Sequence, residues 1–485
     1  MRYHGEVPGY YVENFGCRAT QADGAALERQ FEEGGLERAS TAAQAAVVVL
    51  NTCTVTTGAD QDARAAIRRV RRQNPQAKIV VTGCYAQRAP EEIAALPGVS
   101  LVVGNSHKHQ LAEIALGRSD FPFSGGFVPL DALGQRPSSA CPEQSEGTDD
   151  RPIFVSDIFA HTELLAAPVF DAANERTRPN LKVQDGCDNR CSFCVIPFVR
   201  GQSRSLQIDR IVREVNTLVE AGYREVVISG INLGRWGRDL AFSPQLSALS
   251  QKPQTPHDGL PSLIRAILSE TALEKLRVSS VEPMDWSDEL ISLVASSPRI
   301  AKHAHVPMQS GSDAVLRRMH RKYRPWHYRE KIEKIHSAMP EAAIGADVMV
   351  GFPGETEAEF DETRRMIEEL PFTYLHVFTY SARPGTPAAE MPNQVPVHVA
   401  RERNRILREL AAEKKLAFMR GFGGKSVEAI TLNVIGNDEA GEFTEALTDN
   451  YLKLRLRGRH SANQWLRGLV NNVVNGFLIA DLFPC

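Results

Sequence analysis

The sequence lacks several features that would place it in other classes of protein. None of its apolar runs approaches the ~18 consecutive residues of a membrane-spanning helix, so no transmembrane segment is predicted. The formal net charge is only -3 at pH 7, so any contact with nucleic acid must come from local basic patches. The N-terminal stretch, MRYHGEVPGYYVENFGC, lacks the charged and apolar regions of a secretory signal. We therefore expect a cytoplasmic protein without membrane association.

Cysteine is also scarce, with 8 residues among 485. In a reducing compartment cysteines are more often metal ligands or catalysts than disulfide partners. Three of them share the stretch DGCDNRCSFCV: Cys187, Cys191 and Cys194. Three others are dispersed nearer the N-terminus: Cys17, Cys53 and Cys84. Cys141 has no partner at a familiar spacing and is expected to be a bystander, and Cys485 is given no role.

Residues 1–117 alternate apolar strands with amphipathic helices, which predicts a parallel α/β sheet. The strands are expected at 10–15, 46–51, 78–83 and 101–103. A cysteine follows each of the first three strands, in FGCRAT, NTCTVT and TGCYAQ. Ligands of open parallel sheets bind outside the carboxyl ends of the strands. We therefore expect the three dispersed cysteines to converge at one edge of this sheet.

The remainder of the chain divides into three parts. Residues 118–178 lack sustained periodicity and are interpreted as a linker or insertion. Residues 179–420 carry a second α/β pattern, which indicates a partial barrel or curved sheet with strands at 180–184, 225–230, 275–280, 303–308, 344–352 and 374–380. Residues 421–485 consist of short alternating stretches, which predict a small β-barrel.

The C-x3-C-x2-C spacing of Cys187, Cys191 and Cys194 admits three interpretations. Structural zinc normally needs four ligands, and no nearby Cys or His completes a familiar spacing. A disulfide would leave one thiol unpaired and suits an exported protein better. A four-iron cluster held by three thiolates would leave one iron without a protein ligand, and an open iron can bind a substrate.

This run, with Phe193 before its last cysteine and the first strand of a six-strand domain before it, resembles the signature of the radical S-adenosylmethionine enzymes. In that family the open iron of a 4Fe-4S cluster chelates S-adenosyl-L-methionine, and one electron from the cluster releases a 5'-deoxyadenosyl radical. The resemblance implies that Cys187, Cys191 and Cys194 are both cluster ligands and the catalytic residues.

The dispersed trio makes the chain similar to the methylthiotransferases within that family, where three such cysteines hold a second 4Fe-4S cluster. The resemblance continues in HVPMQSGSDAVLRRMHRKY and ADVMVGFPGET, and the C-terminal barrel is similar to the TRAM module of RNA-modifying enzymes. It implies a methylthiotransferase domain (1–117), a radical S-adenosylmethionine domain (179–420) and a TRAM-like barrel (421–485). It also implies two 4Fe-4S clusters, S-adenosyl-L-methionine and an electron donor of unknown identity.

Five further residues at or near strand ends could contact the cofactor or the substrate base: Gly230, Asn232, Gln309, Ser310 and Asp347. Gly230 ends the second strand of its domain, where the radical family usually has a Gly-Gly-Glu-like motif. Ser229 and Asn232 replace that pattern here. Each of the five also has an ordinary interpretation as a turn residue or a strand-end hydrogen-bonding group.

The expected partner is tRNA. SGINLGRWGRD and RVSSVEPMDW resemble the branch that modifies N6-threonylcarbamoyladenosine next to the anticodon. The other branches act on isopentenyladenosine in tRNA or on an aspartate of a ribosomal protein. An alternative of another class is a non-catalytic iron-sulfur or zinc RNA-binding redox sensor, which would keep the cysteines but need no S-adenosylmethionine.

Two basic stretches support an RNA partner. The helix at 64–72 carries five arginines, and residues 317–331 combine basic side chains with Tyr323, Trp326 and Tyr328. Basic side chains track phosphates, and aromatic rings can stack on splayed bases. Either stretch alone also fits a solvated helix face.

Overall fold

The computed structural model describes residues 9–118, 152–161, 164, 177–240, 259–438 and 441–482. The chain forms two compact units: Met1–His161 with Phe198–Arg200, and Thr162–Pro197 with Gly201–Cys485. Cys141, Cys485 and most of the 118–178 insertion lie outside the described residues. Among the described residues, no helix is long and apolar enough to cross a membrane. The cytoplasmic location and the domain boundaries drawn from the sequence stay predictions.

The first unit is the predicted parallel α/β sheet, with strand order β2-β1-β3-β4-β5-β6 and parallel pairing throughout. Every residue of the central strand β3 is buried, as expected of a parallel sheet that helices cover on both faces. The strands are β1 (Gly9–Asn14), β2 (Glu37–Arg38), β3 (Val47–Thr52), β4 (Lys78–Gly83), β5 (Val99–Val103) and β6 (Ile153–Phe154). The helices are α1 (Arg18–Glu33), α2 (Thr57–Gln73), α3 (Cys84–Arg88), α4 (Pro90–Ala94), η1 (Asn105–Gln110), α5 (Leu111–Leu116) and η3 (Ile158–Ala160).

The second unit contains the six predicted parallel strands, in two sheets ordered β10-β9-β7-β8 and β11-β12-β13. Parallel bridges Leu276–Ile300 and Ser280–His305 connect β10 to the second sheet, which confirms a curved sheet of βα units. The strands are β7 (Asn180–Asp185), the short antiparallel β8 (Arg204–Ser205), β9 (Glu225–Gly230), β10 (Lys275–Val278), β11 (His303–His305), β12 (Ala343–Val350) and β13 (Tyr374–Thr379).

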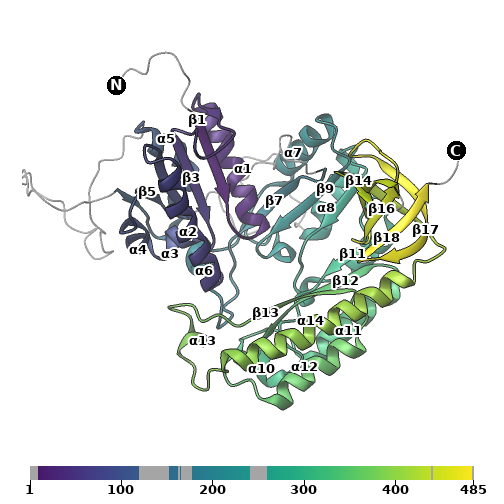
Figure 1. Ribbon diagram of the computed structural model, residues 1–485. Helices are drawn as coiled ribbons and strands as arrows, with labels where there is room; N and C mark the ends of the chain where they lie inside the picture. The colour runs from purple at the N-terminus through teal and green to yellow at the C-terminus, as the bar shows by residue number, and fades with distance from the viewer. Residues whose placement is uncertain are drawn as a thin grey trace, which may run out of the picture. The chain divides into compact units, whose positions relative to one another are not determined.

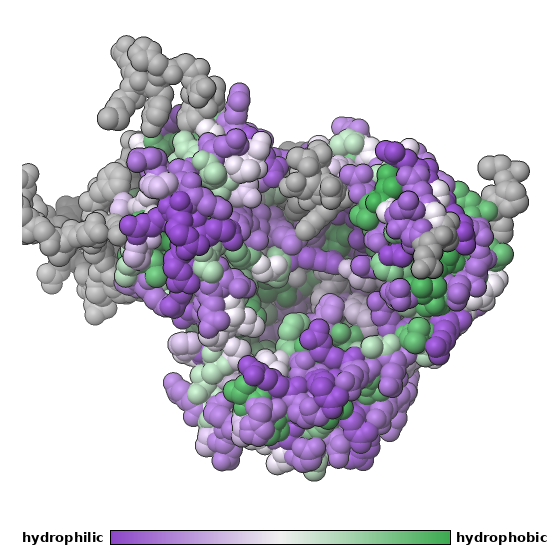
Figure 2. All heavy atoms as spheres, in the orientation of Figure 1, coloured by the Kyte–Doolittle hydropathy of each residue, from purple (hydrophilic) through white to green (hydrophobic). Residues whose placement is uncertain are grey.

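Helices cover one face of the second sheet (Figure 1). Figure 1 shows α11, α12 and α14 along one side of β12 and β13, and the core there is built from residues such as Ile332, Phe360 and Leu407. Their outer surface is dominated by hydrophilic residues (Figure 2). The helices of this unit are α7 (Ile208–Glu220), η4 (Leu233–Arg235), α8 (Leu260–Glu270), η6 (Pro283–Asp285), α9 (Asp288–Ser296), α10 (Asp313–Arg318), α11 (Pro325–Ala338), α12 (Glu357–Glu369), α13 (Pro387–Glu390) and α14 (Val397–Arg420). The short helix α6 (Ile196–Arg200) lies before α7 in the chain, and its residues Phe198–Arg200 belong to the first unit.

The C-terminal strands form a closed barrel in the order β14-β15-β16-β18-β17, which confirms the predicted β-barrel (Figure 1, yellow). Arg277 of β10 connects it to the curved sheet: its Nε donates to Glu225 at 2.6 Å and its Nη1 donates to the carbonyl of Asp449 at 2.9 Å. The ring of Tyr451 stacks on His303 with centroids 4.9 Å apart. The strands are β14 (Ser426–Asp438), β15 (Gly441–Thr448), β16 (Lys453–Arg457), β17 (Trp465–Val474) and β18 (Phe477–Leu482).

Candidate functional site

The three dispersed cysteines lie at the carboxyl ends of their strands, as the pattern predicts. Cys17 precedes α1, Cys53 follows β3, and Cys84 begins α3 after β4. A Cβ on Gly16 would lie 2.6 Å from Cys53 Cβ and 2.9 Å from Cys53 Sγ, so the turn that carries Cys17 passes directly against Cys53. Burial raises the pKa of the Cys53 thiol to about 12, and the nearby thiols of Cys84 and Cys17 add to this rise. The structure therefore brings the trio together.

Buried cations lie close to this trio. Lys108 Nζ donates to Asp23 at 3.0 Å, and Arg200 Nη2 donates to the same carboxylate at 2.9 Å. Both cations are almost fully buried. The charge of Arg200 lowers the pKa of Cys53 against the effect of burial, and Asn105 Nδ2 lies 3.7 Å from Cys84 Sγ as a donor. Positive charge and N–H donors favour thiolates over thiols, as a metal cluster requires.

The clustered trio lies in the loop after β7. Gly186 permits this loop, because it has φ +73° and an added Cβ would lie 1.9 Å from the Gln202 carbonyl oxygen. The Cys187 amide donates to Gly201 O at 3.0 Å, and the Cys194 amide donates to Cys191 O at 3.1 Å. Burial raises the pKa of Cys194 to about 12, with the neighbouring Cys191 and Cys187 thiols adding to it. These three thiols also lie close together.

Two side chains distant in sequence contact this second trio. Arg321 Nη1 donates to Cys191 Sγ at 3.2 Å, and the same guanidinium pairs with Glu282. Asn232 Nδ2 donates to Cys187 Sγ at 3.7 Å. Asn232 was a sequence prediction, whereas Arg321 and Glu282 were not singled out. A cavity of about 20 Å³, enough for one water, lies beside Cys191 and this ion pair.

The other predicted contact residues occupy different environments. Gly230 ends β9, where an added Cβ would lie 2.7 Å from Gln184 Oε1, and that oxygen also accepts from the Asn232 amide at 2.7 Å. Gln309 has φ +63°, and its amide donates to Asp347 O at 2.8 Å. The Ser310 hydroxyl is buried, 3.0 Å from Thr363 Oγ1, and it accepts from the Ser312 amide at 3.1 Å. Their roles in cofactor binding stay predictions.

The base-stacking interpretation is wrong for two of the three aromatic residues in 317–331. Tyr323 and Tyr328 are buried, and their hydroxyls donate to the carbonyls of Met308 and Val306, each at 2.7 Å. Tyr328 lies on the buried side of α11, and Tyr323 lies in the loop before this helix, so both rings belong to the core. Trp326 is 56% exposed and is available to a partner.

The basic helix α2 is partly neutralised. Arg64 pairs with Glu92, and Arg69 pairs with Glu13 at 2.5 Å. These ion pairs fit the alternative interpretation of a solvated helix face for this stretch.

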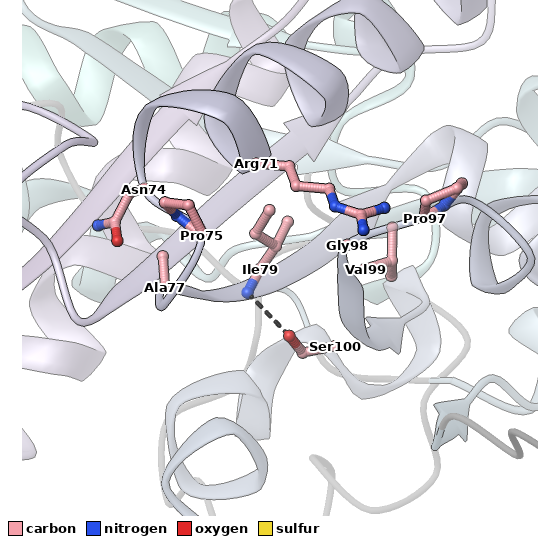
Figure 3. Close-up of a pocket in the computed structure, with 9 residues that line it drawn as sticks. All are labelled: Arg71, Asn74, Pro75, Ala77, Ile79, Pro97, Gly98, Val99 and Ser100. Carbon is pink, nitrogen blue, oxygen red and sulfur yellow. Dashed lines mark hydrogen bonds between the residues drawn. The ribbon is translucent and has the colours of Figure 1, made fainter.

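A pocket of about 400 Å³ lies away from the cysteines of the first unit (Figure 3). It is lined by Ile79 at the start of β4, Val99 and Ser100 at the start of β5, and Arg71 near the end of α2. The Ile79 amide donates to Ser100 Oγ at 3.2 Å across it. Because these are the amino ends of the strands, this pocket is separate from the cysteine trio at the carboxyl ends.

Comparison with known proteins gives two family matches and many relatives. Residues 9–104 match the model described as "Uncharacterized protein family UPF0004", and residues 181–367 match "Radical SAM superfamily". The chain is 36% identical to "Threonylcarbamoyladenosine tRNA methylthiotransferase MtaB" of Bacillus subtilis, over 91% of this chain and 89% of that protein. It is 35% identical to the protein of the same name from Aquifex aeolicus, over 94% and 99%.

More distant matches include another named activity and a solved structure. The chain is 33% identical to "tRNA-2-methylthio-N(6)-dimethylallyladenosine synthase" of Erythrobacter litoralis, over 87% of this chain and 86% of that protein. Its fold is similar to that of a radical S-adenosylmethionine methyltransferase, TsrM, from Kitasatospora setae, with a TM-score of 0.52, 15% identity, and coverage of 79% of this chain and 75% of that one.

Proposed function

Because this chain belongs to the radical S-adenosylmethionine methylthiotransferase family, we propose that it transfers a methylthio group to N6-threonylcarbamoyladenosine in tRNA, next to the anticodon. The substrate class is supported by the names of the MtaB relatives, which cover nearly the whole chain. The observation that carries the reaction type is the presence of two cysteine trios, each at the carboxyl end of a parallel sheet.

The donor sets fit two iron-sulfur clusters. All six cysteines are free thiols, three in each set, and each set has N–H donors directed at sulfur. We assign the 4Fe-4S cluster that binds S-adenosyl-L-methionine to Cys187, Cys191 and Cys194, and a second 4Fe-4S cluster to Cys17, Cys53 and Cys84. When bound, these groups supply the carbon radical that attacks an inert aromatic C–H bond and the methylthio group that replaces the hydrogen.

The protein's own residues hold and polarise these groups. Arg321 and Asn232 donate hydrogen bonds to Cys191 and Cys187, which stabilises negative charge on the sulfurs. Gly230 and Asn232 at the end of β9 and Gln309 and Ser310 after β11 are assigned to the cofactor side of the site. Ser310 acts there through the turn that its hydroxyl holds in place. An external electron donor of unidentified class completes the system.

The experiment is nucleoside mass spectrometry of tRNA from cells with and without the gene. The 2-methylthio derivative of threonylcarbamoyladenosine should disappear on deletion and return when the gene is restored. Loss of the methylthio derivative of isopentenyladenosine instead would assign the chain to the other tRNA branch. If both nucleosides are unchanged, a ribosomal-protein aspartate becomes the substrate to test.

The purified protein separates the enzyme from a redox sensor. After anaerobic reconstitution we expect about eight irons per chain, from two four-iron clusters. Reduction in the presence of S-adenosylmethionine should release 5'-deoxyadenosine. A protein that holds a single zinc and forms no 5'-deoxyadenosine would contradict the enzymatic function.

A further inference from the structure

Three polar side chains meet on the face of the second sheet that the helices do not cover. His305 ends β11, Asp347 lies in the middle of β12, and His376 lies opposite Asp347 on β13. Their strand neighbours Ala304, Ala346 and Val348 belong to the hydrophobic core. Because side chains alternate along a strand, the three polar residues share the opposite face. Only Asp347 was predicted from the sequence, and no step proposed above requires the two histidines.

The separations of their ligand atoms match those around a metal ion. Asp347 Oδ1 lies 3.2 Å from His305 Nε2 and 3.3 Å from His376 Nδ1, and all three atoms lie within 4.8 Å of one another. Zinc bonds to nitrogen and oxygen are about 2.0–2.2 Å long, which puts neighbouring ligand atoms about 3.0–3.4 Å apart in octahedral or tetrahedral geometry. One ion could therefore contact all three side chains with little rearrangement.

His305 distinguishes this arrangement from a simple hydrogen-bonded cluster. The residue is only 8% exposed, and within the described part of the chain its Nε2 lies 3.2 Å from Asp347 Oδ1 without forming a well-aligned hydrogen bond. Its other nitrogen, Nδ1, lies 3.1 Å from the Tyr374 hydroxyl, which in turn lies 2.6 Å from His303 Nε2. Metal-binding histidines commonly have the second ring nitrogen fixed in this way. An ion would satisfy the buried Nε2, which is otherwise costly to leave unpaired.

The cluster is open on one side. The side chain of His376 is 54% exposed and that of Asp347 is 28% exposed. Two imidazoles and one carboxylate suit zinc or a similar transition metal better than magnesium or calcium. Three protein ligands with solvent access would leave a coordination position for water or another oxygen ligand.

We propose that His305, Asp347 and His376 form a binding site for one divalent transition-metal ion, of which zinc is the best probe. The site shares no ligand with either cysteine trio and does not depend on the proposed methylthiolation. Tyr374 is its positioning residue, since it holds the His305 ring with Nε2 directed at the other two ligands.

The test is zinc binding to the full chain with its clusters reconstituted. The protein is equilibrated anaerobically with chelator-buffered zinc, and zinc and iron per chain are measured together by plasma mass spectrometry. We expect about one zinc per chain with unchanged iron, and zinc-edge X-ray absorption with only nitrogen and oxygen ligands. Zinc bound by sulfur, or zinc gained at the expense of iron, would assign the binding to the cysteines and overturn the proposal.

Variants make the assignment specific. His376→Ala removes an exposed side chain and should weaken zinc binding about 100-fold or more, as should Asp347→Asn, while Tyr374→Phe should weaken it about 10-fold. His398→Ala, at an exposed histidine of α14, is the matched control and should bind zinc like the unmodified protein. Equal zinc affinity in all of these proteins, or no zinc binding in any, would overturn the site.

Discussion

At the residue scale, Gly16 sets how closely the first two cysteines of the N-terminal trio can approach. It has φ +100°, a backbone conformation that side-chain-bearing residues rarely adopt, and it lies against Cys53. Gly35 has a similar backbone, with φ +81°, but nothing lies within 4 Å of the position of its missing Cβ. Replacing Gly35 therefore tests backbone strain alone, whereas replacing Gly16 tests the same strain together with contact with Cys53.

Gly16→Ala should disrupt the N-terminal trio specifically. The added methyl would collide with Cys53, so the two loops must move apart, and iron content should fall from about eight to about four per chain if each trio holds one four-iron cluster. Gly35→Ala carries comparable backbone strain, on the order of 1 kcal/mol, and should keep all its iron. Iron and sulfide analysis with thermal melting of both variants checks this. Full iron content in a folded Gly16→Ala protein would contradict the placement of this cluster.

The cysteines could be predicted from the sequence, because a local spacing and a position after a strand are both visible along the chain. Arg321 could not, since it contacts Cys191 across 130 positions and looks like one of several cations in a basic helix. The same holds for His305 and His376, which become neighbours of Asp347 only through the register of three strands. Tyr323 and Tyr328 show the converse error, because the composition of a stretch does not tell which of its side chains are buried.

At the element scale, the buried cation Arg277 joins β10 to the C-terminal barrel. Arg277 is 1% exposed and pairs with the fully buried Glu225, while its other nitrogens donate to the carbonyls of Thr448 and Asp449. A buried ion pair is not in itself strongly stabilising, but removing one partner leaves the other charge buried and alone. Replacing Arg277 alone should therefore destabilise this contact with the barrel more than replacing both members of the pair.

Arg277→Met should destabilise the second unit by about 3–5 kcal/mol, because Glu225 loses its main partner in the core. Arg277→Met combined with Glu225→Gln should recover part of this loss, since no unpaired charge remains. Arg265→Met removes an exposed ion pair with Glu289 and should cost at most about 1 kcal/mol. The free energies of unfolding are measured by denaturant titration of the full chain, with trypsin cleavage of the barrel as the probe of unfolding. If the Arg277→Met protein is as stable as the Arg265→Met protein, the role of Arg277 is contradicted.

The strands were predictable as elements, but their ends were not. The six strands of the curved sheet appear at the predicted places, because each is an apolar run bounded by turns. β10 and β11 stop at Val278 and His305, short of the predicted 280 and 308, because the chain beyond them pairs only through isolated bridges such as Ser280–His305 and Gln309–Val348. The closed barrel was predictable as a class, whereas the parallel pairing of β16 with β18 needed the structure.

At the scale of the whole molecule, the two cysteine trios belong to different compact units. The chain leaves the clustered trio at Cys194 and enters α6, whose residues Phe198–Arg200 belong to the unit of the dispersed trio. There Arg200 pairs with Asp23 at 2.9 Å, and the Val199 carbonyl accepts from Asn105 at 2.7 Å. The covalent chain thus connects one set of ligands to the surroundings of the other, although each set is built by its own sheet.

This division predicts that two activities can be lost separately. Cys187→Ala should abolish reductive formation of 5'-deoxyadenosine and, with it, methylthiolation, because the cluster that binds S-adenosylmethionine loses one of its three ligands. Cys53→Ala should retain 5'-deoxyadenosine formation but lose methylthiolation, because only the other unit is altered. Chromatography of 5'-deoxyadenosine and mass spectrometry of the tRNA nucleosides, on folded protein with measured iron, provide both readouts. Equal loss of both activities in the two variants would mean that the trios do not act as separate sites.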